Sequence, residues 1–469
     1  MQLRTRPLRT IMTIGAATAL GAAGVKYAGR TVVNKIHDKA LKILTTDLYD
    51  ENLWELVSST ARIGPQITLE TSLRAQYGKL LERPMGSPYR FPSLEDIKFN
   101  VAQLATMPTN MEPEVSVRVT IGKQAKKPLV IENPMMIAPM AYGSALSKKV
   151  KIALAKGSAM AGTATNSGGG PFLQEERDAA KYLIFQYHRG DWGIKPEFIK
   201  QADAIEIQLG QGAYAGVGYM IKNQLLDEEL RKAYGISKGQ DILSESRQFE
   251  VQCPGDLKGL IDKLRKMTDG VPVGVKIAAG KQLEADLYWI CKSGADFVVV
   301  DGAESATKGS PPILQDDFGI PTVFAVYRAA QWLNKNGYKE KVSLIAAGKI
   351  RTPGDVLKVC ALGADACCIG AIALVAVSHP FITKALPYEP PTAITWYESH
   401  YAKDFDIDIG AKALNNFLEA CKLELIMGIR ALGKTALSQV NTDDLVTNSE
   451  LIAKGCNIPM SYEPYPFEP

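Results

Sequence analysis

Eight short apolar runs between residues 133 and 370 constrain the fold of this 469-residue chain more than any other feature. Most of them are apolar throughout, as expected for strands that are buried on both faces of a parallel sheet. The runs are Met135–Ala138, Ser158–Thr163, Leu183–Tyr187, Ala204–Leu209, Val273–Ile277, Phe297–Val300, Ser343–Ala346 and Ala366–Gly370.

Helix-compatible stretches separate many of these runs. They are Lys148–Lys156, Asp256–Lys266, Leu283–Ser293, Ala325–Asn336 and Pro353–Ala361. Eight strands that alternate with helices predict an α/β fold, a closed (β/α)8 barrel, with an open doubly wound sheet as the alternative. No GxGxxG motif follows the first run, which weighs against a dinucleotide-binding open sheet.

The barrel is expected to be one of four segments. These are an N-terminal segment (1–45), an extension (46–130), the barrel (131–380) and a C-terminal helical tail (381–469). The extension is rich in proline and looks irregular from Asp47 to Lys127, with one alternating stretch, Val115–Ile121, that predicts a strand. The tail contains an amphipathic segment, Leu414–Leu432, which is expected to pack on the outside of the barrel.

The N-terminal segment carries an uncharged run from Ile11 to Val25, preceded by arginines and followed by Lys26 and Arg30. The run is short for a membrane span, which needs about 20 residues. A longer segment, residues 11–33, would be long enough to cross a membrane. Three interpretations stay open: an uncleaved membrane anchor, a cleaved signal peptide and a soluble Ala-rich helix. Positive charge on both flanks leaves the orientation open.

Charge and cysteine usage exclude several classes of protein. The net charge is only +4, and no basic run is interleaved with aromatic residues, so a nucleic-acid partner is not expected. The seven cysteines are scattered without a CxxC pair, which argues against a zinc ribbon or an iron–sulfur cluster. The odd count fits reduced thiols, and therefore a cytoplasmic protein, membrane-anchored if the N-terminal segment spans.

Two glycine turns predict a phosphate site. In a (β/α)8 barrel the functional groups lie where the strands end, on the C-terminal face. The seventh run is followed by Gly348 and Lys349, and the eighth by Gly370 and Ala371. Such turns bring backbone N–H groups close to an anion, and the next helix adds its positive N-terminus. A phosphate-bearing cofactor is therefore expected after strands seven and eight.

Lys276 lies near the end of the fifth run. A lysine within an apolar strand is costly unless its charge meets an anion or a delocalised ring, so we expect it to contact the cofactor. The alternative is a buried ion pair with Asp301 or Glu304, which follow the sixth run.

Polar side chains also end the third and fourth runs. Gln208 and Gln211 can form hydrogen bonds with a flavin edge or a substrate. His188 ends the third run and His379 follows the last, and either can act as a proton donor, although a lone histidine is more often structural. No Ser-His-Asp set or metal-ligand cluster stands out.

From about Ile121 to Lys454 the chain resembles the FMN-binding domain of the glutamate synthase large subunit. The segments that carry the resemblance are 134–147, 186–193, 205–212, 272–277, 348–355, 370–371 and 416–445. The resemblance implies FMN, and cofactor-binding roles for Met140, Ala141, Tyr142, Thr165, Gln186, Gln208, Lys276, Gly302, Gly348, Lys349, Gly370 and Ala371. It also implies Lys276 near the flavin ring and Gln208 and Gln211 on the substrate side, with Lys308 as an anion contact or electrophile.

Departures from the family's pattern fall in the substrate half of the site. Glycine replaces the acidic residue of the second-strand loop, Gln208 replaces a lysine, and Asp191 replaces an arginine. Tyr214 and Val217 replace a lysine and a glutamate, and Lys308 is added in a bulkier loop, 305–310. Residues 379–401 contain no cysteine for the family's iron–sulfur centre, and no amidotransferase domain is expected.

The sequence thus predicts an FMN-dependent oxidoreductase acting on a small, less charged substrate. Because the iron–sulfur cysteines are absent, electrons are expected from a ferredoxin-like partner or from NAD(P)H. Two alternatives stay open: a true glutamate synthase, ammonia- or ferredoxin-dependent, and a non-catalytic flavin-barrel subunit of a membrane complex. Homo-oligomerisation also stays open.

Overall fold

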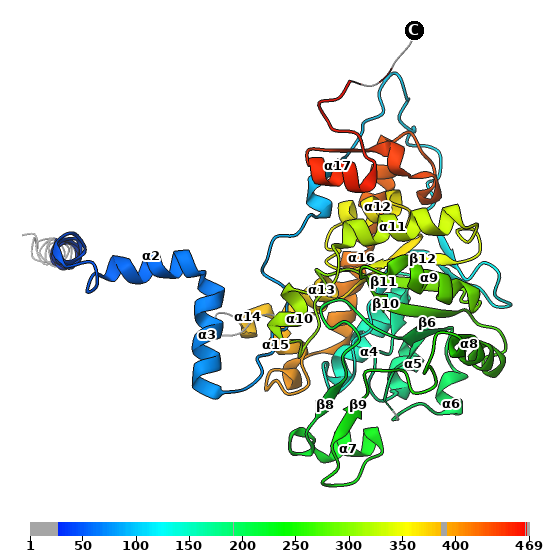
Figure 1. Cartoon of the computed structure of the whole chain (residues 1–469), viewed down its shortest axis with the longest axis horizontal. Helices are drawn as coiled ribbons and strands as arrows, with labels where there is room; N and C mark the ends of the chain where they lie inside the picture. The colour runs from blue at the N-terminus through cyan, green and yellow to red at the C-terminus, as the bar shows by residue number, and fades with distance from the viewer. Residues whose placement is uncertain (1–26, 191, 386–391, 465, 467–469) are drawn as a thin grey trace, which may run out of the picture. The chain divides into compact units, whose positions relative to one another are not determined.

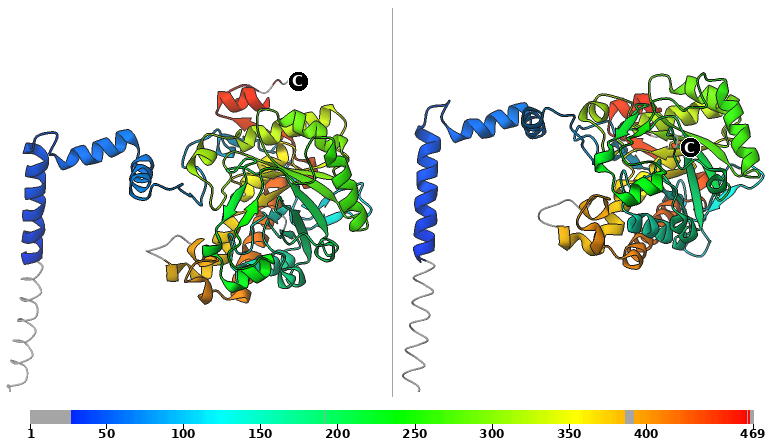
Figure 2. Two further views of the ribbon diagram at one scale, coloured as in Figure 1. Left: turned by 60° about the horizontal axis from the view of Figure 1, so that its bottom comes forward. Right: turned by 90° about the horizontal axis from the view of Figure 1, so that it is seen from below.

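The computed structural model describes residues 27–190, 192–385, 392–464 and 466, which fall into two compact units divided between Leu81 and Glu82. The first unit consists of helices (blue in Figure 2): one over residues 27–46, α2 (Leu53–Ile63) and α3 (Pro65–Tyr77). The prediction that the chain is irregular from Asp47 to Lys127 is therefore wrong for α2 and α3. Asn52 caps α2 and proline begins α3, which gives each helix a defined start.

The predicted membrane segment, residues 11–33, lies mostly outside the described residues. Within the part of the chain that the structure describes, no helix has the length and apolar character that crossing a membrane requires.

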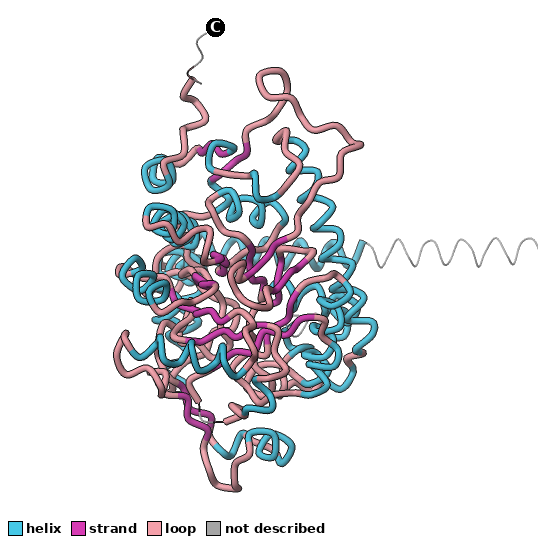
Figure 3. Tube along the Cα trace, turned by 90° about the vertical axis from the view of Figure 1, so that its right-hand side faces the viewer, coloured by secondary structure: helices cyan, strands magenta, loops and turns pink. Residues whose placement is uncertain are grey.

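The second unit is built on eight parallel strands. They are β4 (Met135–Ile137), β5 (Ala164–Asn166), β6 (Tyr182–Tyr187), β7 (Ala204–Gln208), β10 (Val273–Ala278), β11 (Phe297–Asp301), β12 (Ser343–Ala347) and β13 (Ala366–Ile369). Their order is β4-β13-β12-β11-β10-β7-β6-β5. The two end strands face each other, since Thr163 Oγ1 beside β5 donates to the Met135 carbonyl in β4 at 2.9 Å. The sheet is thus nearly closed, which confirms the (β/α)8 barrel over the open sheet (Figures 1 and 3).

The second predicted strand is misplaced. Helix α4 (Lys148–Met160) runs through its first residues, and the strand begins only at Ala164. Short apolar runs fit a buried helix as well as a strand, and α4 buries much of its surface between the barrel and the C-terminal tail.

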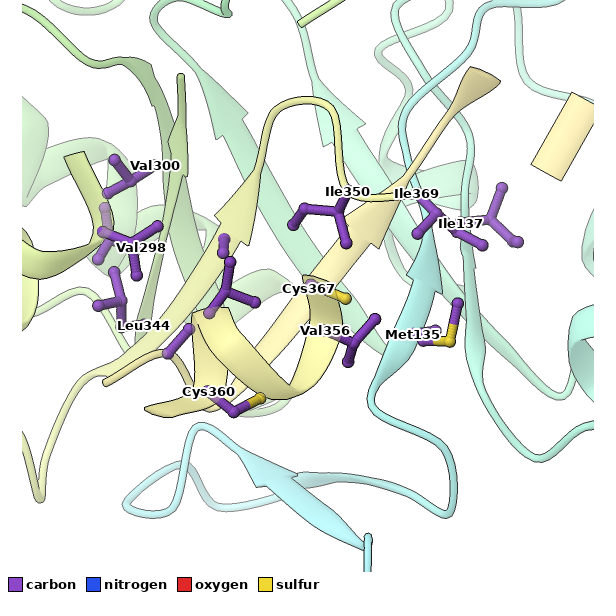
Figure 4. Close-up of a cluster of buried hydrophobic side chains, with 14 of the residues drawn as sticks. Met135, Ile137, Val298, Val300, Leu344, Ile350, Val356, Cys360, Cys367 and Ile369 are labelled. Atoms are coloured by element: carbon purple, nitrogen blue, oxygen red, sulfur yellow. The ribbon is translucent and has the colours of Figure 1, made fainter. Parts of the chain in front are cut away.

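The five predicted helices are confirmed. With α4 they are α8 (Asp256–Met267), α9 (Leu283–Lys292), α11 (Thr322–Lys335) and α12 (Pro353–Ala361), and α13 (Ala371–Ser378) follows the last strand. Figure 4 shows how this layer packs: Val356 and Cys360 of α12 lie in one apolar cluster with Leu344, Cys367 and Met135 from the strands.

The interior of the barrel is filled and closed at its N-terminal end. Met136, Val299, Ile345 and Cys368 form one buried cluster with residues of a hairpin, β2 (Val119–Ile121) and β3 (Leu129–Ile131). The hairpin includes the end of the predicted strand, Val115–Ile121. Because it plugs this end, only the opposite, C-terminal end of the strands is left to form a site.

The C-terminal tail packs on the barrel as predicted, through α16 (Ile407–Ala431, orange in Figure 2). The helix begins earlier than expected because Asp406 caps it by accepting from the backbone N–H groups of Asp408 and Ile409. Gly157 of α4 allows the close approach, since a Cβ there would lie 2.8 Å from the Ala411 carbonyl oxygen.

An insertion between β7 and α8 was not predicted. It contains the hairpin β8 (Tyr219–Ile221) and β9 (Ile242–Ser244), with α7 (Glu228–Tyr234) between them, and it projects from the barrel (Figure 1). The remaining strands and α-helices are β1 (Ile97–Phe99), α5 (Gln174–Ala179), α6 (Pro196–Ile199), α10 (Pro312–Asp316), α14 (Ile382–Ala385), α15 (Thr392–Thr395), β14 (Leu445–Thr447) and α17 (Glu450–Cys456).

Candidate active site

Toward the C-terminal ends of its strands, the barrel interior changes from apolar to polar side chains. Five buried side chains from consecutive strands form this polar layer: Asn166, Gln186, Glu206, Lys276 and Asp301. Lys276 Nζ lies 3.1 Å from Asp301 Oδ2. Glu206 Oε1 accepts from Gln186 Nε2 at 2.7 Å and from Asn166 Nδ2 at 3.2 Å. Hydrogen bonds thus join β5, β6 and β7, an ion pair joins β10 and β11, and the opposite charges of Glu206 and Lys276 link the two groups into one electrostatic network.

The network keeps Lys276 charged in a dry environment. Burial opposes its charge, but Asp301 and Glu206 outweigh burial and raise the lysine's pKa above its ordinary value. Burial raises the pKa of Glu206, with Lys276 acting in the opposite direction. Of the two predicted partners, Asp301 is the one that pairs with Lys276. Glu304 instead accepts from the backbone N–H of Thr322 at 2.7 Å.

The two predicted glutamines lie together beside this network. Gln208 is aligned with Lys276 in the register between β7 and β10. Its Nε2 donates to Gln211 Oε1 at 2.9 Å, and Gln211 Nε2 donates to Thr307 Oγ1 at 3.1 Å. The three side chains form a neutral chain of donors and acceptors that joins the loops after β7 and β11.

Lys308 belongs to the same loop as Thr307 but points to other partners. Its Nζ lies 2.6 Å from Glu398 Oε2 and 5.0 Å from the centre of the Trp396 ring. The structure therefore does not bring it together with Lys276, Gln208 and Gln211.

The turn after β12 is fixed by its glycine. Gly348 has a φ of +117°, and a Cβ there would collide with Thr322 Oγ1, as would a Cβ on Gly302. Lys349 also has a positive φ, 52°, and is exposed. Gly302 and Gly348 thus let three loops meet at Thr322, which places Lys349 beside the end of the strand.

The N-termini of the two following helices differ. Thr352 and Asp355 form a capping box on α12, so its first N–H groups are already satisfied. Gly370 precedes α13 without any side-chain cap, and Gly370 and Ala371 are partly exposed. The N-terminus of α13 therefore keeps N–H groups that can bind an anion, and it adjoins the Gly348–Lys349 turn because β12 pairs with β13.

The loop after β4 forms part of the barrel mouth, the rim where the strands end and the loops that follow them begin. Met140 and Ala141 are partly exposed. The glycine loop after β5 packs against them so tightly that a Cβ on Gly168 would lie 2.5 Å from the Met140 carbonyl carbon. Tyr142 turns toward the insertion, where its hydroxyl donates to Glu229 Oε1 at 2.8 Å. The Tyr142 side chain is thereby drawn away from the interior.

Strand alternation separates Thr165 from the network. Asn166 faces the interior, so Thr165 faces the helical layer, where its hydroxyl is buried without a hydrogen-bond partner. Asn166 and Glu206 are the polar residues that sequence reasoning missed. The argument that singled out Lys276, a polar group inside an apolar strand, would have found both.

Unpartnered polar atoms gather where β6 ends. His188 Nε2, Arg189 Nε, Gln248 Oε1 and Tyr234 Oη are buried and have no hydrogen-bond partner. Burial lowers the pKa of His188 to about 3, so the imidazole is neutral. Its Nδ1 lies 3.2 Å from the Gly190 N–H, and its ring stacks on Trp192 at 5.0 Å. His379, by contrast, is exposed.

The fold and the mouth together define a class. A filled (β/α)8 barrel, a free helix N-terminus beside an exposed lysine, and a buried cation at the strand ends fit a flavin phosphate and ring. A solved flavocytochrome b2 variant with pyruvate bound has a similar fold, with a TM-score of 0.51 at 16% identity over 82% of this chain and 87% of that one.

The chain belongs to the glutamate synthase family. The conserved region in glutamate synthase matches residues 87–435. A glutamate synthase large subunit-like protein of Rhizobium meliloti is 32% identical over 398 residues, 81% of this chain and 90% of its own length. An archaeal glutamate synthase [NADPH] of Archaeoglobus fulgidus is 33% identical over 311 residues, 66% of this chain and 61% of its own length. The predictions of family, fold, FMN and an FMN-dependent oxidoreductase are thereby confirmed.

Proposed function

We propose that this FMN-dependent oxidoreductase acts on a small substrate with fewer negative charges than an imine derived from 2-oxoglutarate. The observation that carries the proposal is the neutral chain from Gln208 through Gln211 to Thr307, beside the buried Lys276. Two carboxylates on one substrate need cations, whereas amides and hydroxyls suit a neutral or singly charged polar group.

Three of the cations near the mouth, Lys276, Lys308 and Arg189, already have partners. Lys276 pairs with Asp301, and Lys308 pairs with Glu398. Arg189 donates to the main-chain carbonyls of Val217, at 3.1 Å, and of Gly216 and Ser246. A dicarboxylate would have to break the interactions of Lys276 or Arg189, and a buried cation gives up a partner only at considerable cost.

The cofactor roles follow the geometry of the loops. The α13 N-terminus at Gly370 and Ala371, together with Lys349, would hold the FMN phosphate, and Met140 and Ala141 would line the ring site. Bound FMN supplies hydride transfer. Lys276 keeps a fixed positive charge at the ring site, and Asp301 holds the ammonium in place. Gln208 and Gln211 orient the substrate's polar group.

We infer a supporting role for Lys308. Its partner Glu398 is exposed, so an anionic group of the substrate can replace that carboxylate at little cost. Thr165, Tyr142 and Gln186 are weaker candidates for cofactor contact, because the side chains of Tyr142 and Gln186 are engaged elsewhere and Thr165 faces the helical layer.

Two donors of electrons remain in the proposal. Several archaeal-type relatives are named for NADPH, which favours a reduced nicotinamide, and a ferredoxin-like protein is the other candidate. The relatives' names also favour a second function, glutamate synthesis. The match covers only 61% of the Archaeoglobus protein's length. Glutamate synthesis, the activity in that protein's name, is therefore the second candidate function for this chain. Membrane association through residues 11–33 likewise remains a proposal from the sequence.

The test compares acceptors after anaerobic reduction of the purified protein with NADPH, NADH or reduced ferredoxin. Reoxidation is followed with pyruvate plus ammonium and with 2-oxoglutarate plus ammonium. We expect pyruvate to be preferred at least about tenfold, a difference of about 1.4 kcal/mol. Gln208→Lys should reverse or narrow the preference, whereas the exposed control Gln103→Lys should not. Glutamate production from 2-oxoglutarate at equal or higher rate would establish the second candidate instead.

A further inference from the structure

A cavity of about 570 Å³ lies beside the barrel mouth, and none of the residues proposed above for FMN or substrate lines it. Its walls come from the loop after β7 (209–216), the end of β10 (277–280), the segment leading into α8 (247–257), helix α9 and residues 318–319. Small-molecule sites typically have volumes of about 300–1,000 Å³, so the cavity is large enough for a ligand of its own.

The lining is mainly apolar, with two aromatic side chains open to solvent. Leu257, Ile277 and Ile290 are buried and form the deeper wall. Trp289 is 37% exposed and Phe318 is 49% exposed, although both line the same cavity. Large apolar groups that stay exposed around a concavity mark a binding surface, and two aromatic faces favour a flat ring between or against them.

An arginine side chain at the cavity offers a contact for an anion. Arg247 lines it, and its side chain makes no ion pair or hydrogen bond with any residue that the structure describes. Lys292 lies 5.3 Å from the centre of the Trp289 ring but does not itself line the cavity. The carboxyl of Asp286 also lines the cavity and opposes an anion there, although burial raises its pKa. A guanidinium group without a partner can donate two parallel hydrogen bonds to a carboxylate.

We propose that this cavity is a second binding site, for an aromatic carboxylate whose ring packs on Trp289 and Phe318 and whose carboxylate pairs with Arg247. The site does not depend on the proposed substrate. It shares the wall at Ala278 and Ala279 with a space of about 20 Å³ that reaches Gln211 and Asp301. A ligand in the cavity is therefore one layer of residues away from the proposed catalytic side chains.

The test uses 1-naphthoate and its neutral isostere 1-naphthamide as probes, measured by calorimetry on the full chain with its bound flavin. We expect naphthoate to bind at least about tenfold more tightly than naphthamide. Arg247→Gln should abolish the difference, Asp286→Asn should strengthen naphthoate binding, and the exposed control Lys238→Gln should change neither. Equal binding of the two probes, or tighter binding of 1-naphthylamine, would overturn the proposal.

Two glycines offer a matched pair of blocking variants. A Cβ on Gly280 or on Gly259 would meet no atom within 4 Å, but Gly280 lines the cavity and Gly259 does not. Gly280→Phe should therefore fill the cavity and remove naphthoate binding, whereas Gly259→Phe should retain it. Survival of naphthoate binding in both Gly280→Phe and Arg247→Gln would place the probe elsewhere and refute the site.

Cys253 provides an independent readout that does not depend on catalysis. It lines the cavity and is exposed, whereas the other six cysteines are buried. Naphthoate should slow its alkylation by iodoacetamide in the unmodified chain and in Gly259→Phe. No protection at saturating naphthoate would contradict the proposed position of the ligand.

Discussion

Replacing His188 by asparagine tests whether the imidazole at the end of β6 is buried and neutral in the folded protein. The imidazole is buried, and its pKa falls from an ordinary value of 6.5 to about 3. In the unfolded chain the His188 imidazole therefore binds a proton below about pH 6.5. In the folded chain it binds that proton only below about pH 3. Because the unfolded state binds more protons in this window, stability is lost as the pH falls. The loss approaches about 1.4 kcal/mol per pH unit well below pH 6.5, so it amounts to about 2 kcal/mol between pH 8 and pH 5.

Asparagine keeps an acceptor near the Gly190 N–H but does not titrate, so His188→Asn should lose about 2 kcal/mol less stability over this interval. Urea unfolding at pH 8, 6.5 and 5, with saturating FMN, measures the difference. The exposed His379→Asn is the control, and its pH dependence should match that of the unmodified chain. Parallel curves for the unmodified chain and His188→Asn would show that the histidine is not buried and neutral as described.

Three further substitutions probe the mouth. Asp301→Asn leaves the buried Lys276 without its carboxylate and should cost about 3–5 kcal/mol in urea unfolding, and the double variant with Lys276→Met should recover part of this. Gly348→Ala should cost about 1–3 kcal/mol through its positive φ alone, and should also weaken FMN binding because the side chain collides with Thr322. Lys308→Met should raise the KM for an anionic substrate while leaving FMN affinity, measured by fluorescence titration, unchanged.

The barrel could be predicted because its strands are buried on both faces. Such strands read as continuous apolar runs, and seven of the eight begin within one residue of the predicted position. The second failed because a short apolar run cannot distinguish a buried helix from a strand, and α4 is buried against α16. The insertion with β8, α7 and β9 gave no apolar run, since its strands are only partly buried.

The site was predictable only in part, for a physical reason. Lys276 stands out in the sequence because a charge in an apolar strand needs a partner, and the structure supplies Asp301. The partner of Lys308 is 90 residues away, so no local pattern could reveal it. The capping box that occupies the α12 N-terminus depends on hydrogen bonds, and only the structure shows that α13 is the free helix end.

The visible absorption spectrum of the purified protein tests the central claim most directly. The account predicts the spectrum of oxidised flavin with close to one FMN per chain, released on denaturation and identified as FMN by chromatography. If the flavin is lost during purification, the folded protein should recover the spectrum when FMN is added. A folded protein that is colourless and takes up no added FMN would contradict the assignment of the barrel mouth as a flavin site.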